Sequence, residues 1–206
     1  MNLLWYFGYG SLVNRNTRPV DEFAIDARLS GWQRAWAHRV VNAHGGDVNC
    51  TSLTVEPVGG GAATSDSIEG VLVCIPEDAL PALDCREAGY ERLEVPVASL
   101  EFENDRQSQR IDAEYVIVYR SLPRNRHPAN EKFPILHSYI NCVMAGFHQR
   151  FGDTGLQAML ESTRGWESAI RDDREDPLYP RHVQLDAERS QYFETLLSRH
   201  RNRERL

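Results

Sequence analysis

The stretch Tyr6-Phe7-Gly8-Tyr9-Gly10-Ser11-Leu12 follows directly on an apolar run that begins at Leu3. This pattern predicts a strand that ends in a glycine loop. Glycines flank Tyr9, and because glycine tolerates positive φ and has no Cβ, main-chain N–H groups can converge on a ligand at such a loop. A carboxylate or an oxyanion would suit it. An ordinary strand followed by a tight turn gives the same GxG pattern. Other parts of the sequence are needed to distinguish a ligand-binding loop from such a turn.

Composition and charge limit the classes of function. The chain has 206 residues, of which 41% are hydrophobic, enough for a well-buried core in one domain. Its formal net charge of -7, from 30 acidic and 23 basic residues, argues against a nucleic-acid partner bound through phosphate neutralisation. The sequence leaves the oligomeric state open.

Residues 3–7 are apolar but too short to cross a bilayer, and they lack the flanking features of a secretory signal. We therefore expect a cytoplasmic protein with no membrane partner. The four cysteines form no CxxC pair and the histidines form no HExxH motif, so we expect free, mostly buried thiols and no metal site. The cysteines are Cys50, Cys74, Cys85 and Cys142.

The first part of the chain is dominated by strand patterns. Alternating or continuous apolar runs predict extended chain at residues 23–41, 50–58, 68–75, 91–102 and 111–119. The strands at 50–58 and 68–75 are expected to be antiparallel neighbours, joined by a flexible linker around Gly59-Gly60-Gly61. A short helix is expected after Pro76, with acidic residues in its first turn and Gly89 at its end.

The second part is expected to be helical. Apolar residues recur at helical spacing over 133–151, and shorter helices are predicted at 155–162 and 186–201. Residues 163–182 carry many charges and prolines and are expected to be irregular. We find no internal repeat and no second core, which favours one domain.

Trp32, Arg34 and Trp36 share one face of their predicted strand. Two interpretations are open. Their side chains could be part of the core, with the guanidinium stacked or ion-paired, or the indoles could stack on a substrate; the former is favoured.

Three separated blocks together resemble the γ-glutamylcyclotransferase superfamily, particularly its ChaC-like branch. They are Phe7-Gly8-Tyr9-Gly10-Ser11-Leu12, Gly31-Trp32-Gln33-Arg34-Ala35-Trp36 and Leu83-Asp84-Cys85-Arg86-Glu87-Ala88-Gly89-Tyr90. The first resembles the family's YGS loop after its first strand, and the third its helix-end segment with an acid before a glycine and an aromatic residue. The resemblance covers roughly the first 120 residues, and the chain beyond about residue 123 matches poorly.

The resemblance implies an α+β fold, a mixed β-barrel with flanking helices and a helical C-terminal part. Residues 1–206 would form a single domain, with a barrel core at 1–122 and a helical extension at 123–206. The implied reaction cyclises a small γ-glutamyl compound, such as glutathione, a γ-glutamyl amino acid or a γ-glutamyl amine. The substrate's α-amino group attacks its own γ-carbonyl and releases 5-oxoproline, with no cofactor and no metal.

Glu87 matches the family's acid by position and suits the chemistry as general acid and base. The attacking amine has to lose a proton and the leaving nitrogen has to gain one, and a carboxylate whose pKa is raised by burial can do both. The alternative is an ordinary exposed glutamate at a helix end.

The loop residues Tyr9, Gly10, Ser11 and Leu12 are the candidate substrate-binding group, because preorganised N–H donors can hold a carboxylate or an oxyanion. Ser11 as a hydrolytic nucleophile is the competing interpretation, but no GxSxG elbow surrounds it. Three tyrosines are candidates to wall the pocket, although any of them could be plain core: Tyr115, Tyr119 and Tyr139.

A different class of function remains open. The chain could be a non-catalytic or regulatory member that binds a γ-glutamyl-like ligand on the same fold, because fold does not fix function.

Overall fold

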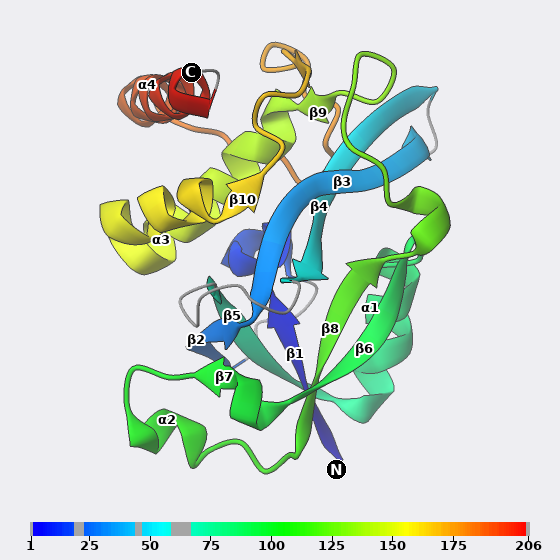
Figure 1. The fold of residues 1–206 in the computed structure, drawn as a ribbon, viewed down its shortest axis with the longest axis vertical. Coiled ribbons are helices and arrows are strands. Elements are labelled where there is room, and N and C mark those ends of the chain that lie inside the picture. The colour runs from blue at the N-terminus through cyan, green and yellow to red at the C-terminus, as the bar shows by residue number, and fades with distance from the viewer. Residues whose placement is uncertain (1, 19–22, 44–46, 59–66, 205–206) are drawn as a thin grey trace.

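The computed structural model describes residues 2–18, 23–43, 47–58 and 67–204. Two mixed sheets and three longer helical segments make up the fold (Figure 1). One sheet has six strands in the order β6-β8-β1-β5-β2-β7, and the other has five in the order β10-β3-β4-β9-β11. The expected α+β class, with curved strands forming a partial barrel flanked by helices, is confirmed.

β1 (Leu3–Gly8) lies in the middle of the six-stranded sheet. It pairs antiparallel with β5 (Ser67–Pro76) and parallel with β8 (Tyr115–Ser121). Trp5, Tyr6 and Phe7 are all at least 94% buried, so both faces of the strand are covered, as its uninterrupted apolar run indicates. β2 (Ala24–Ser30) and β7 (Leu100–Glu101) extend the sheet beyond β5, and β6 (Tyr90–Pro96) extends it beyond β8.

The five-stranded sheet is built on a long hairpin that curves across the molecule (Figure 1). Its arms are β3 (Trp32–Ala43) and β4 (Val48–Pro57), and the register shifts between Trp36 and His38 and again after Val40. Short parallel strands from the second part of the chain complete it: β9 (Ile135–Leu136), β10 (Thr163–Arg164) and β11 (Ile170–Arg171).

The helices flank these sheets. α1 (Leu80–Arg86) leads into β6, and α2 (Asp105–Ser108) is a single turn between β7 and β8. α3 (His137–Glu161) packs against the five-stranded sheet, and α4 (Ala187–Glu204) packs on α3. Gly152, at φ 66°, interrupts the helical geometry of α3, which explains why the sequence predicts two helices there.

Arg34 is a large cation in the core. Arg34 is fully buried and donates from Nε to the carbonyl of Tyr9 at 2.8 Å, from one terminal nitrogen to Ser162 Oγ at 2.6 Å and from the other to the carbonyl of Glu69. Its guanidinium also lies 4.8 Å from the ring centroid of Phe147. Trp36 is buried as well, so the core interpretation is confirmed for Arg34 and Trp36, whereas Trp32 is only partly buried at the edge of the core.

Two expectations, one about strand pairing and one about secondary structure, were wrong. The strands at 50–58 and 68–75 are not neighbours, because β4 pairs with β3 and β9 whereas β5 pairs with β1 and β2. The segment 163–182 is not wholly irregular, because β10 and β11 form within it. The Gly59-Gly60-Gly61 linker lies outside the described residues.

Candidate active site

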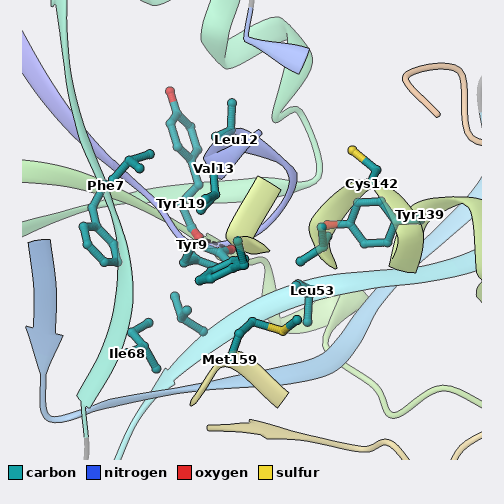
Figure 2. Close-up of a cluster of buried hydrophobic side chains, with 14 of the residues drawn as sticks. Phe7, Tyr9, Leu12, Val13, Leu53, Ile68, Tyr119, Tyr139, Cys142 and Met159 are labelled. Atoms are coloured by element: carbon teal, nitrogen blue, oxygen red, sulfur yellow. Dashed lines mark hydrogen bonds between the residues drawn. The ribbon is translucent and has the colours of Figure 1, made fainter. Parts of the chain in front are cut away.

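A small cavity lies at the end of β1, beneath the glycine loop. Its volume is about 30 Å³, room for little more than a carboxylate or two water molecules. Aromatic, aliphatic and loop residues enclose it together with one carboxylate: Phe7, Tyr9, Gly10, Ser11, Leu12, Leu53, Glu87, Tyr90, Tyr119 and Tyr139. Figure 2 shows Tyr9, Leu53 and Tyr139 in this buried cluster. We refer to the cavity enclosed by these ten residues as the inner cavity.

The glycine loop is held in place from both sides. The carbonyl of Tyr9 accepts the hydrogen bond from Arg34, and its hydroxyl donates to the carbonyl of Tyr119 at 2.6 Å. A Cβ on Gly10 would lie 3.3 Å from Tyr139 Oη and 3.4 Å from Leu53 Cδ1, so the chain approaches the cavity wall closely at this glycine. The loop is therefore preorganised before any ligand arrives.

The loop offers unused donors. After Gly10 the chain enters the 3-10 turn Ser11–Val13, in which Val13 N–H donates to the Gly10 carbonyl. Within residues 2–18, 23–43, 47–58 and 67–204, the N–H groups of Gly10, Ser11 and Leu12 donate to no protein acceptor. These consecutive donors belong to residues that line the inner cavity, the arrangement an oxyanion or carboxylate requires.

Glu87 supplies the carboxylate of the inner cavity. It follows α1 directly, and its side chain is 14% exposed. Burial raises the pKa of its carboxyl group, while the nearby charges of Arg86 and Arg181 partly offset that rise. Arg86 Nε lies 3.0 Å from Glu87 Oε1, so one carboxylate oxygen is held in an ion pair.

A larger groove opens beside the inner cavity. Its volume is about 510 Å³, and it shares Ser11, Glu87, Tyr90 and Tyr139 with the inner cavity. We refer to it as the outer groove. The shared residues mark a junction, so a ligand could place one end in the inner cavity and the remainder in the groove.

The outer groove is rich in guanidinium groups. Arg39, Arg86, Arg124 and Arg181 line it. Glu87 is the carboxylate among its lining side chains, so the field in the groove favours an anion. His38 also lines the groove, and burial lowers the pKa of its imidazole to about 4, so it adds no positive charge at neutral pH.

The tyrosines of the inner cavity remain protonated. Burial, followed by the charge of Glu87, raises the pKa of Tyr9 well above its ordinary value, and burial does the same for Tyr90 and Tyr139. Tyr90 uses its hydroxyl to donate to the Leu53 carbonyl at 2.8 Å. These rings therefore act as neutral walls and hydrogen-bond donors.

The structure brings together most residues singled out from the sequence. Glu87, Tyr9, Gly10, Ser11 and Leu12 all line the inner cavity, as do two of the three candidate wall tyrosines, Tyr119 and Tyr139. Tyr115 does not join them. It is 52% exposed and paired with Pro96, because it begins β8 at the end remote from the glycine loop, and only Tyr119, further along the strand, reaches the cavity.

Other lining residues were not identified from the sequence. Arg86 stands out there only as a neighbour of Glu87, and Tyr179 and Arg181 lie in the segment that was expected to be irregular. The adjacency of Arg86 to Glu87 was the one available signal. No feature of the sequence marked His38 or Arg39 as a lining residue of the outer groove.

No metal or membrane feature emerges from the described residues. Among them, no group of three or more His, Cys, Asp or Glu side chains is placed to hold a metal ion. The helices of this part of the chain include none with the length and apolar character needed to span a membrane. All four cysteines are free thiols.

Comparisons with known proteins relate this chain to one protein family and to several solved structures of the same fold. The sequence profile of the ChaC-like protein family matches residues 4–133. A solved structure described as a gamma-glutamyl cyclotransferase superposes with a TM-score of 0.55 at 15% identity, over 94% of this chain and 99% of that one. A human protein described as uncharacterized, loc79017, gives a TM-score of 0.54 at 16% identity, over 94% and 99% of the two chains.

YkqA from Bacillus subtilis gives a TM-score of 0.53 at 19% identity, over 78% of this chain and 54% of that one. At such identities the structural likeness establishes a shared fold. No curated protein sequence matches the chain.

Proposed function

This chain belongs to the ChaC-like protein family, and we propose that it is a γ-glutamyl cyclotransferase that releases 5-oxoproline from a small γ-glutamyl compound. The observation that carries the proposal is that Glu87 and the loop 9–12 line one cavity. Intramolecular cyclisation needs a base and an anion-binding group within the length of one small substrate, and this cavity supplies both.

The base in this proposal is Glu87. Its carboxylate takes a proton from the substrate's α-amino group, whose nitrogen attacks the γ-carbonyl carbon and closes a five-membered ring. The tetrahedral intermediate then collapses, the amide C–N bond breaks, and the proton passes from Glu87 to the leaving nitrogen. The products are 5-oxoproline and a free amine, and no water is consumed. The raised pKa of Glu87 suits a group that must both accept and return a proton near neutrality.

The donors in this proposal are the N–H groups of Gly10, Ser11 and Leu12. Negative charge develops on the γ-carbonyl oxygen during attack, and the substrate's α-carboxylate also has to be held so that the chain folds back on itself. Preorganised N–H groups meet either need without reorganisation. Because the attacking nitrogen belongs to the substrate, Ser11 is not required as a nucleophile, and its hydroxyl instead accepts a hydrogen bond from Arg86 at 3.3 Å.

The charge and size of the outer groove indicate which γ-glutamyl compounds the enzyme would prefer. The inner cavity, at about 30 Å³, is too small for a whole substrate, so the leaving group extends into the groove of about 510 Å³. There Arg39, Arg124 and Arg181 favour a leaving group that carries a carboxylate. We therefore place γ-glutamyl amino acids and peptides, glutathione among them, ahead of γ-glutamyl amines.

We also propose that residues 1–206 act as a single domain. Tyr139, Tyr179 and Arg181 come from the part after residue 122, yet they line the same groove as Glu87. The helical part is thus expected to contribute to the site as well as to the fold.

The decisive experiment measures 5-oxoproline after incubation of the purified protein with γ-glutamyl-alanine, glutathione, a γ-glutamyl amine and α-glutamyl-alanine. We expect turnover of the γ-glutamyl peptides, weaker turnover of the amine and none of the α-glutamyl isomer, whose geometry does not give the same ring closure. Binding of the γ-glutamyl compounds in a calorimeter without any 5-oxoproline would favour the non-catalytic ligand-binding alternative.

A further inference from the structure

The segment between β11 and α4 passes the N-terminal end of α3 and reaches the outer groove. It comprises residues 172–186, which form neither helix nor strand. We refer to residues 172–186 as the strap. Tyr179 and Arg181 of the strap line the outer groove. Because no helix or sheet fixes the backbone of the strap, the placement of these two side chains depends on its contacts with the rest of the molecule.

A buried carboxylate attaches the strap to α3. Asp173 is 6% exposed, whereas its neighbours Asp172 and Arg174 are exposed. Asp173 Oδ1 accepts a hydrogen bond from Ser138 N–H at 2.8 Å. Its Oδ2 accepts from the Ser138 hydroxyl and, at 2.9 Å, from Leu178 N–H. One carboxylate thus joins the first turn of α3 to a point further along the strap.

The N-terminal end of α3 favours this carboxylate. Leu136, which precedes the helix, has no side chain able to cap it. The first turn of a helix leaves N–H groups without partners in the helix and stabilises a negative charge beside them. The hydrogen bonds of Asp173 and the helix end together compensate for its burial. We therefore regard Asp173 as the anchor of the strap.

The same hydrogen bonds set the position of Tyr179. The Ser138 hydroxyl, which donates to Asp173, accepts from Tyr179 N–H at 3.2 Å. The Tyr179 residue is 6% exposed, and its ring packs edge-on against Tyr139 with ring centroids 4.9 Å apart. Burial raises the pKa of Tyr179, and a hydrogen bond with the side chain of Ser11 offsets part of that rise. Tyr179 therefore connects the strap to the glycine loop.

Arg181 follows two residues later and is exposed. Because burial does not hold its side chain, its place in the outer groove depends on the course of the strap backbone. Arg86 and Arg181 both lower the pKa of the Glu87 carboxyl group. The tyrosines around Glu87 stay protonated and His38 is neutral, so they carry no charge that would act on it. Displacement of the strap would therefore affect both the groove and Glu87 through Arg181.

We propose that Asp173 is a positioning residue that holds Tyr179 against the glycine loop and Arg181 in the outer groove. This inference rests on the proposed cyclotransferase function. Asp173 lines neither the inner cavity nor the outer groove, so it acts through the strap. Glu87 and the loop 9–12 belong to other elements and keep their places without it. Loss of the anchor should therefore weaken substrate binding more than it slows the chemical step.

Two variants that differ in charge test the anchor. Asp173→Asn is nearly isosteric but keeps one acceptor oxygen in place of two, and Ser138→Ala removes the hydroxyl without a change of charge. For both we expect KM for γ-glutamyl-alanine to rise roughly 3–10-fold, with kcat within about twofold of the parent value at a pH above the acidic limb. Asp172→Asn, on the exposed side of the strap, is the matched control and should keep the parental KM. An unchanged KM in both test variants, whether or not kcat falls, would overturn the inference.

The pH–rate profile shows whether Asp173 acts through Arg181. Loss of the Asp173 charge by itself would lower the pKa of Glu87, whereas displacement of Arg181 would raise it. We therefore expect the acidic limb of kcat/KM to move to higher pH in Asp173→Asn and in Ser138→Ala, and to stay in place in Asp172→Asn. A merely structural role would lower the amount of active enzyme and leave the limb where it is. A limb that stays in place or moves to lower pH in the test variants would contradict the inference.

A double-mutant cycle distinguishes coupled from independent effects. Arg181→Gln should raise KM in the parent protein. In the Asp173→Asn background it should add less than about a further twofold, because Arg181 is already displaced. Fold-changes that multiply would show that the two side chains act independently, and the inference would be wrong. Absence of 5-oxoproline from every γ-glutamyl compound with the unaltered protein would instead end the proposed function.

Hydrogen exchange on the unaltered protein depends neither on folding of the variants nor on turnover. Glutaryl-alanine lacks the α-amino group and cannot cyclise, so it serves as a stable ligand. We expect the N–H groups of Leu178 and Tyr179 to be protected although the strap has no regular secondary structure, because they donate to Asp173 and Ser138. Their exchange should slow further when glutaryl-alanine binds beside Arg181. Exchange as fast as in an exposed peptide, or exchange that bound glutaryl-alanine leaves unchanged, would refute the positioning role.

Discussion

Arg86 Nε lies 3.0 Å from Oε1 of Glu87, and both side chains are largely buried, at 9% and 14% exposure. Two features of this environment, burial and the positive charge of Arg86, shift the pKa of the Glu87 carboxyl group in opposite directions. Burial raises the pKa of Glu87 and the Arg86 charge lowers it, with burial the larger effect. Arg86 also donates to the Thr17 carbonyl and to Ser11 Oγ, so the same side chain connects the candidate base to the glycine loop.

Glu87→Gln should keep the fold and remove activity. The change is nearly isosteric and deletes the ability to accept and return a proton, so we expect kcat to fall by about 10²–10⁴-fold with a small change in KM. Steady-state release of 5-oxoproline measures this. Glu94→Gln, on the exposed side of β6, is the matched control and should retain parental activity. A fully active Glu87→Gln enzyme would show that the base is another group.

Arg86→Met should move the acidic limb of the pH–rate profile. Glu87 has to be ionised to accept a proton, so kcat/KM rises with pH through its pKa. Because Arg86 lowers that pKa, its removal raises it, and the limb should shift to higher pH. Arg92→Met, which removes an exposed partner of Asp84, is the control and should leave the limb in place. A shift to lower pH would contradict the role given to Arg86.

The local parts of this fold could be predicted from the sequence, and the long-range parts could not. The apolar run before Gly8 identified β1, and the helical periodicity after residue 133 identified α3, because each signal lies within one element. The pairing of 50–58 with 68–75 was inferred from proximity along the chain. That inference failed because the β3–β4 hairpin curves away into its own sheet, which leaves β5 between β1 and β2.

The candidate site divides in the same way. Glu87 and the loop 9–12 carry a local pattern, so the sequence alone is enough to single them out. The guanidinium groups of the outer groove come from β3, α1, the short 3-10 helix Pro123–Asn125 and a turn at Arg181. Nothing in their own surroundings along the chain distinguishes them from surface arginines. Tyr115 was selected as a residue type able to wall a pocket, and only the register of β8 reveals that it points elsewhere.

Arg34→Met should destabilise the protein strongly. The change removes a fully buried cation that serves the carbonyl groups of Tyr9 and Glu69 and the hydroxyl of Ser162, and it leaves these buried acceptors unsatisfied. We expect the free energy of unfolding to fall by at least about 3 kcal/mol in urea titrations. Arg28→Met is the control, because its side chain is 49% exposed and its loss should cost less than about 1 kcal/mol. Similar losses in the free energy of unfolding for both variants would contradict the conclusion that the hydrogen bonds of Arg34 stabilise the glycine loop and its surroundings.

His38 should make the protein less stable in acid. Its pKa is lowered from 6.5 to about 4 in the folded state, so between these values the unfolded chain binds a proton that the folded chain does not. Stability is therefore lost as the pH falls through this window, by up to about 3 kcal/mol, and is unaffected by this group above it. Urea unfolding at pH 7.5 and pH 4.5 tests the point by comparison with His38→Phe, whose loss of stability over the same interval should be smaller. Equal losses in the two proteins would mean that His38 is not buried as a neutral ring.

The arginines of the outer groove should act on binding of the leaving group more than on chemistry. Arg124→Gln and Arg181→Gln remove charges from the groove, so we expect KM for γ-glutamyl-alanine to rise several-fold, with a smaller change for a γ-glutamyl amine that lacks the carboxylate. Added salt should weaken binding of the carboxylate substrate by the parent enzyme and have less effect on the variants, because exposed charges are screened. Arg110→Gln is the control, since that guanidinium lies over Phe23 and does not line the groove. An equal rise in KM for the amine and the carboxylate substrate would mean that these arginines do not interact with the carboxylate of the leaving group. The ranking of γ-glutamyl peptides over γ-glutamyl amines would then be wrong.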